Sequence, residues 1–186
     1  IPANYSGGRL GLAYYQDHTE IRHGPFRALD ITGKSKSTVL SFRQPVHLGK
    51  ASQVDLIAGA RSRSTDNWIS GVFLASSDSV DANIGAEAQY ADASGYWAGA
   101  YSYTRGSAKV DERSDYWYGR GWLRRLQRLG SERSLVGSLS FQNTSKPLLP
   151  SSEQFIIGGE GSVRGYPVGT WAGETGYTLS AEYHHP

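Results

Sequence analysis

Residues 80–90 read VDANIGAEAQY, and this stretch decides the fold class of the chain. Apolar and polar positions alternate along it without a break. One set is Val80, Ala82, Ile84, Ala86, Ala88 and Tyr90, and the other is Asp81, Asn83, Gly85, Glu87 and Gln89. Successive side chains of a β-strand point to opposite faces, so a period of two predicts a strand with one apolar and one polar face.

The same alternation predicts strands in most of the chain. Further candidates lie at residues 9–15, 38–43, 53–61, 97–104, 135–141 and 177–183. Residues 122–129, WLRRLQRL, allow either a strand or a basic amphipathic helix on a lipid surface. Gly119 and Gly121 precede this segment without a capping residue, and the neighbouring aromatic residues favour a strand. We therefore expect an all-β chain of about eight strands.

Composition excludes several classes of protein. The 186 residues include no Cys, which excludes disulfides, thiolate zinc sites and a Cys nucleophile. The formal net charge of +2 lacks the excess expected of a nucleic-acid-binding protein. His184 and His185 have no third ligand at metal spacing, so neither a metal nor another cofactor is expected. The longest apolar run, residues 71–75, is far shorter than the ~20 residues of a membrane-spanning helix.

The expected connections between strands alternate in length. Short turns are predicted at residues 46–52, 91–95 and 129–133 and after Tyr183, and long polar loops at 17–36, 62–79, 105–114 and 143–173. Outer-membrane barrels have this asymmetry, with short turns facing the periplasm and long loops facing outside. We predict a transmembrane antiparallel up-and-down β-barrel. The alternative is a soluble β-sandwich with one wet face, because alternation alone does not distinguish lipid from a protein core.

A glycine-rich segment, FIIGGEGSVRGYPVG at residues 155–169, closes the last long polar stretch. A dinucleotide-binding loop would need a third glycine where Arg164 stands, and no Lys-Ser or Lys-Thr pair follows to complete a phosphate-binding loop. The segment therefore does not predict nucleotide binding. No arrangement of residues in the chain predicts catalysis.

FIIGGEGSVRGYPVG closely resembles the loop-six signature of the TpsB transporters of two-partner secretion, the haemolysin and haemagglutinin secretion/activation proteins. These proteins are related to the barrel-assembly protein BamA. The resemblance extends from about residue 9 to the end of the chain, through FRALDITG, FRQPV, RLQRL, LPSSEQF and GETGYTLSAEYHHP. It implies a pore in the outer membrane of a Gram-negative bacterium. The expected partners are the membrane lipid and a large exported protein, unfolded in transit and β-helical when folded.

The resemblance also implies how the chain is organised. The family barrel is larger than eight strands and follows periplasmic POTRA domains. We therefore expect residues 1–186 to form part of a single barrel domain, with the POTRA domains and the terminal strands outside this sequence. The absence of Met agrees with an internal portion of a longer protein. Residues 145–173 are expected to form a long loop that folds into the lumen.

By the same resemblance, this loop is anchored by its arginine. Arg164 is expected to pair with a carboxylate of the inner barrel wall, while Gly165 lets the backbone pass and Tyr166 packs beside the arginine. The anchor motif consists of Gly158, Gly159, Val163, Arg164, Gly165 and Tyr166. The family's usual acidic partner lies on a strand after the end of this chain, and Asp81, Glu87 and Glu182 are candidate partners on the predicted polar faces. A guanidinium can bind a carboxylate through two parallel hydrogen bonds, which makes a directional tether.

Three functions from different classes follow from these observations. The first is export of a haemagglutinin- or haemolysin-like partner protein, with no enzymatic activity. The second is insertion of other barrels by a BamA-type assembly factor, against which the RLQRL and FRQPV strands weigh. The third is binding by a soluble β-sandwich module.

Overall fold

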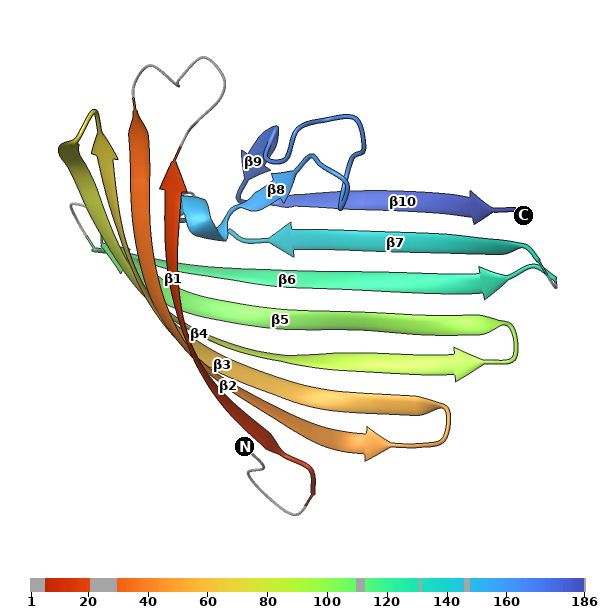
Figure 1. Ribbon diagram of the computed structural model, residues 1–186. Helices are drawn as coiled ribbons and strands as arrows, with labels where there is room; N and C mark the ends of the chain where they lie inside the picture. The colour runs from red at the N-terminus through yellow and green to blue at the C-terminus, as the bar shows by residue number, and fades with distance from the viewer. Residues whose placement is uncertain (1–5, 21–29, 110–112, 131, 146–147, 186) are drawn as a thin grey trace.

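The computed structural model describes residues 6–20, 30–109, 113–130, 132–145 and 148–185. Eight strands form one antiparallel sheet in the order β1-β2-β3-β4-β5-β6-β7-β10, so every long strand pairs with its neighbour in the chain (Figure 1). Their bounds are β1 Arg9–Glu20, β2 Ile31–Leu48, β3 Ser52–Ile69, β4 Val72–Asp92, β5 Gly95–Lys109, β6 Arg113–Arg128, β7 Ser134–Asn143 and β10 Gly176–His184. The predicted all-β, up-and-down organisation is confirmed.

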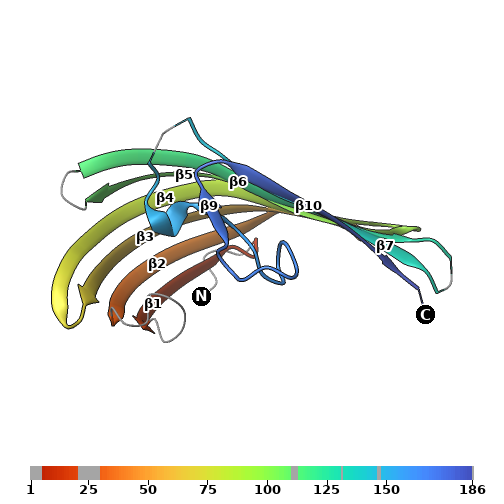
Figure 2. The ribbon, with the colours of Figure 1, turned by 90° about the horizontal axis from the view of Figure 1, so that it is seen from above.

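The sheet curves into a trough, and three short elements lie over its concave face (Figure 2). They are a 3-10 turn, η2 (Ser151–Glu153), and a small hairpin of β8 (Phe155–Ile157) and β9 (Trp171–Gly173). All three belong to the connection between β7 and β10. Within the described ranges, no helix is long and apolar enough to cross a membrane.

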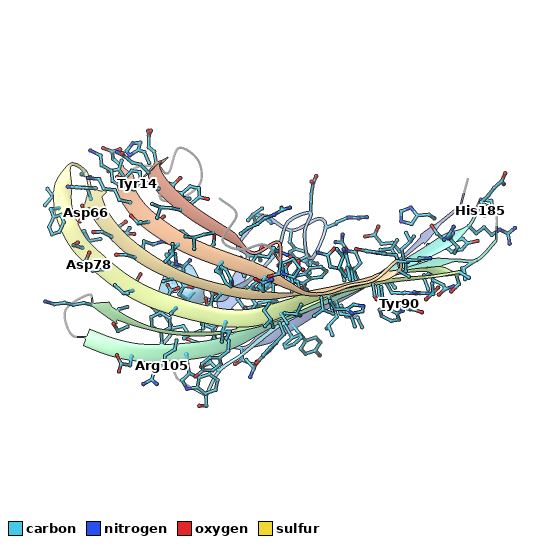
Figure 3. The ribbon with its side chains drawn as sticks, turned by 90° about the horizontal axis from the view of Figure 1, so that it is seen from below. Tyr14, Asp66, Asp78, Tyr90, Arg105 and His185 are labelled. Atoms are coloured by element: carbon cyan, nitrogen blue, oxygen red, sulfur yellow. The ribbon has the colours of Figure 1, made fainter. Side chains whose placement is uncertain are left out.

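The two faces of the sheet differ in chemistry as residues 80–90 predict. Val80 and Ile84 are 59% and 65% exposed, whereas Asp81 between them is 4% exposed. Residues opposite each other in a ladder share a face, so this division extends across the sheet. The convex face carries Tyr90 and Arg105 (Figure 3) and exposes large apolar side chains that include Leu12, Leu40, Leu56 and Leu179. Polar side chains buried on the concave face include Ser37, Asp55, Asp81, Thr104 and Gln142.

The helical alternative for residues 122–129 is wrong. β6 pairs with β5 along one edge and with β7 along the other, and Leu123 lies opposite both Gly99 and Leu139. Backbone groups shared with two neighbours satisfy the hydrogen bonds that a helix would have made internally. The apolar residues of this segment therefore divide between the two faces of a strand.

The predicted long loop 62–79 is largely strand and two others are strand in part, so this prediction needs correction. β3 and β4 continue through residues 62–79 to a two-residue turn, Ser70-Gly71, with φ of 49° and 76°. Positive φ at both positions suits a tight hairpin turn. Likewise, β1 and β2 run into the stretch 17–36, and β5 and β6 into 105–114; residues 21–29 and 110–112 lie outside the described residues.

Strand length explains these polar strand ends. β4 has 21 residues, which at ~3.3 Å per residue extend ~70 Å, whereas the apolar band of an outer-membrane barrel is ~25 Å tall. Strands that continue into water carry polar residues on both faces, so period two disappears although the hydrogen-bond ladder persists. The short turns predicted at 46–52 and 91–95 are confirmed at the other end of the sheet. The one at 129–133 connects β6 to β7 there, with residue 131 outside the described residues.

Candidate functional site

The long connection from β7 to β10 returns over the concave face instead of projecting away from the sheet (Figures 1 and 2). It has two parts. Residues 148–154, which include η2, form the loop base. Residues 158–170 form the loop tip and are joined to the base through the β8–β9 hairpin, in which Phe155 pairs with Gly173 and Ile157 with Trp171.

Glycines shape the loop tip. Gly158 and Gly159 have φ of 121° and 89°, and a Cβ on Gly158 would lie 2.2 Å from the carbonyl oxygen of Pro167. The Gly158 amide donates to Ser162 Oγ at 2.8 Å, and the Gly159 amide donates to the Tyr166 carbonyl at 2.9 Å. These bonds close the tip on itself, and Val163 forms an isolated bridge to Gly159.

Arg164 projects from the tip to β10. Its Nη2 lies 2.6 Å from Glu182 Oε1, and the two side chains are 70% and 36% exposed. Of the three candidate carboxylates, Glu182 is thus the one in contact with Arg164. The other two bind arginines of the wall: Asp81 pairs with Arg61 at 2.8 Å, and Glu87 pairs with Arg43 at 2.5 Å.

The remaining motif residues lie around this contact. Gly165 has a φ of 89°, and no atom lies within 4 Å of the position that a Cβ would take. The Tyr166 ring packs against Trp171 of β9, with centroids 5.0 Å apart. Tyr166 therefore connects the tip to the β8–β9 hairpin.

Glu153 holds the loop base, and it is the most enclosed carboxylate among the described residues, at 1% exposure. Tyr118 Oη donates to Glu153 Oε2 at 2.7 Å, and Arg61 Nη2 donates to Oε1 at 2.7 Å. Ser152 Oγ donates to Oε1 at 3.0 Å. Burial would raise the pKa of Glu153, but the hydrogen bonds from Tyr118 and Arg61 outweigh it and keep the pKa below the ordinary value.

The backbone of the loop base is held as firmly as the Glu153 side chain. The Glu153 carbonyl accepts from Gln142 Nε2 at 2.9 Å and from Arg120 Nη2 at 3.2 Å. Gln142, itself 1% exposed, also donates to the Glu174 carbonyl at 3.0 Å, so one amide joins both arms of the loop. Leu149, at 4% exposure, completes the base in an apolar cluster with Ala108, Tyr116 and Tyr118.

Beside the loop, the concave face has an open groove of about 750 Å³. Its lining includes Arg43, Arg61, Asp81, Glu87 and Arg120. Charges of both signs and paired hydrogen-bonding groups make this wall hydrophilic without a strong net charge. In the part of the chain that the structure describes, no three His, Cys, Asp or Glu residues are placed to hold a metal ion.

A family model described as haemolysin secretion/activation protein ShlB/FhaC/HecB matches residues 1–186. The chain belongs to this family. The family resemblance seen in FIIGGEGSVRGYPVG is therefore confirmed. The expected location, the outer membrane of a Gram-negative bacterium, is confirmed with it. No curated protein sequence matches the chain.

Two solved structures of CdiB are similar to this ShlB/FhaC/HecB member. CdiB from Acinetobacter baumannii is 17% identical with a TM-score of 0.72, and CdiB from Escherichia coli is 19% identical with a TM-score of 0.75. Each comparison covers 95% of this chain and 34% of the CdiB chain, so the chain spans about a third of the length of these proteins. The likeness confirms the β-barrel fold, and the soluble β-sandwich alternative is wrong.

Sequence reasoning missed the base of the loop in this ShlB/FhaC/HecB protein. Glu153 stood within LPSSEQF, but its partner Arg61 is 92 positions away in the chain. No periodicity relates such distant residues. The only local signal is a carboxylate two positions before the apolar residues of β8.

Proposed function

We propose that the full-length protein exports a large haemagglutinin- or haemolysin-like partner through the lumen of its barrel. In this proposal the convex face contacts lipid, the concave face lines the lumen, and residues 145–173 are a loop that lies inside it. The partner passes unfolded and folds outside as a β-helix. Membership of a secretion/activation family supports export over the assembly of other barrels.

The observation that carries this proposal is the return of the loop over the polar concave face, with Arg164 in contact with Glu182. An unfolded chain in transit presents unpaired backbone groups, which a wall of arginines and carboxylates can solvate. A loop lying in that path must also give way. The contact between Arg164 and Glu182 suits such a role, because exposed ion pairs contribute only ~0–1 kcal/mol and can be exchanged for other partners at low cost.

The test is replacement of Arg164 in the full-length protein, expressed with its secreted partner. Arg164→Ala is expected to reduce the amount of partner in the medium, while the amount of heat-modifiable barrel in the outer membrane stays near normal, because the inter-strand ladder is untouched. Arg164→Lys is expected to restore little, since lysine keeps the charge but not the planar donor group.

Arg128→Ala is the matched control. It removes one exposed arginine from the same face of β6 as Arg120, at the position opposite Ser134 of β7. Normal export by Arg164→Ala would remove the transport role proposed for the anchor motif. Normal export by Arg164→Lys would show that charge alone is sufficient.

A further inference from the structure

We propose that the long loop is held at two places of unequal strength, a fixed base positioned by Glu153 and a releasable tip held by Arg164. This inference rests on the proposed function, in which the loop gives way to a polypeptide. It states which part moves: the tip swings on the β8–β9 hairpin while the base stays against the wall. Glu153 is then a positioning residue for the loop.

Burial within this chain, which spans about a third of the length of the CdiB proteins, separates the two attachments. Glu153 is 1% exposed, whereas the side chains of Arg164 and Glu182 are 70% and 36% exposed. A charge pair in water exchanges readily with solvent and ions. A buried carboxylate that loses its partners becomes an uncompensated charge in a poorly solvated place, so it resists withdrawal.

The number and origin of the contacts point the same way. Side chains of β3, β6 and β7 converge on Glu153, through Arg61, Tyr118 and Gln142. These contacts use both carboxylate oxygens and the carbonyl oxygen. Withdrawal of the base would break all of them together and would expose Leu149. Within residues 1–186, withdrawal of the tip breaks the ion pair of Arg164 with one residue of β10.

A glycine lies at or near each end of the loop tip, where a moving tip would require hinges. Gly158 and Gly169 flank the tip directly after β8 and shortly before β9, with φ of 121° and 76°. Glycine can leave a left-handed conformation for many others without a steric penalty, so changes in φ and ψ can be absorbed there. The three-residue strands β8 and β9 separate these two glycines from the base.

The experiment measures exposure of the base in the full-length protein in outer membranes, with no secreted partner present. Leu149→Cys serves as the reporter, because Leu149 is 4% exposed and residues 1–186 contain no cysteine. Any cysteine elsewhere in the full-length protein is first replaced by serine. The rate of reaction with a bulky water-soluble maleimide is compared in three backgrounds: otherwise wild type, Arg164→Ala and Glu153→Gln. Heat-modifiable migration confirms the folded barrel in each.

Labelling is expected to stay within about twofold of the wild-type rate in Arg164→Ala and to rise at least ~10-fold in Glu153→Gln, because glutamine keeps the shape but removes the charge that binds Arg61. Equal acceleration in both backgrounds would mean that the loop is one body, and no acceleration in Glu153→Gln would mean that Glu153 does not hold the base; either overturns the proposal.

If Glu153→Gln gives no folded barrel, Tyr118→Phe decides. It removes the hydroxyl that donates to Glu153 and leaves the ring beside Leu149. Faster labelling of the reporter then supports the fixed base, and an unchanged rate overturns it. These rates do not depend on export, so failure of the two-attachment loop and failure of the proposed transport function would appear in different assays.

Discussion

Replacing Ile84 with arginine tests whether the convex face of β4 meets lipid. The apolar alternation from Val80 to Tyr90 covers ten residue steps, or ~33 Å along the strand. At a strand tilt of ~40° this distance corresponds to ~25 Å across the membrane, the height of the apolar band of such barrels. Ile84, 65% exposed, lies one step from the centre of that band.

An arginine at this depth is expected to cost ~2–4 kcal/mol of the free energy of unfolding. That cost corresponds to a ~30- to 700-fold smaller ratio of folded to unfolded protein. The assay is urea unfolding of the full-length protein in lipid vesicles, followed by heat-modifiable migration on gels. Asn83→Arg is the matched control, because Asn83 is the adjacent residue and lines the groove on the concave face. Its cost is expected to stay below ~1 kcal/mol.

The comparison of the two arginine variants decides the topology. Equal destabilisation by Ile84→Arg and Asn83→Arg would refute the assignment of the convex face to lipid. Greater destabilisation by Asn83→Arg would assign the concave face, and not the convex face, to lipid.

Three further predictions concern the wall and the loop. A cysteine at Ala86 is expected to be shielded from a bulky water-soluble thiol reagent and one at Glu87 to react through the lumen; equal labelling would contradict the assigned faces. Gly158→Ala is expected to lower export with the barrel still folded, because its Cβ would meet the Pro167 carbonyl at 2.2 Å, and Gly161→Ala, with open space around its Cβ, is the control expected to export normally. The pKa of Glu153 is lowered on folding, so its contribution to stability is complete above the ordinary carboxyl pKa of 4.5 and is lost as the pH falls through the lowered pKa. A spin label attached at Ser151 should therefore keep its mobility from pH 7 to pH 5 and become more mobile only in stronger acid. A gain in mobility already at pH 6 would contradict this assignment.

The two faces of a strand could be predicted from the sequence wherever one face meets water and the other meets lipid. Residues 80–90 have lipid-compatible side chains on one face and polar ones on the other, so the period of two is visible. Residues 62–79 are equally regular in the structure, but polar residues stand on both faces, so no period of two marks them. The sequence therefore predicts the membrane portion of a strand and not its full length.

The contacts of the long loop between β7 and β10 were predictable from the sequence only in part. Arg164 was found because it belongs to a local motif, and Glu182 because it lies on an alternating strand. The partners of Glu153 could not be predicted in this way, because Arg61 and Tyr118 lie on β3 and β6, which the curved sheet brings to the same carboxylate. Contacts of that kind depend on the curvature of the whole sheet, which no single segment encodes.

The hairpin at Ser70-Gly71 lies at the end of the sheet that we expect to face outside, so it bears on how antibodies would recognise the cell. Trp68 and Phe73 pack edge to face with centroids 6.2 Å apart, and Lys34 lies 5.5 Å from the centroid of the Trp68 ring, so three strands reinforce one another far from the apolar band. This supported β-hairpin presents a fixed three-dimensional epitope rather than a flexible peptide. We expect an antibody selected on the folded hairpin to stain intact bacteria and to lose its target when the protein is boiled before electrophoresis.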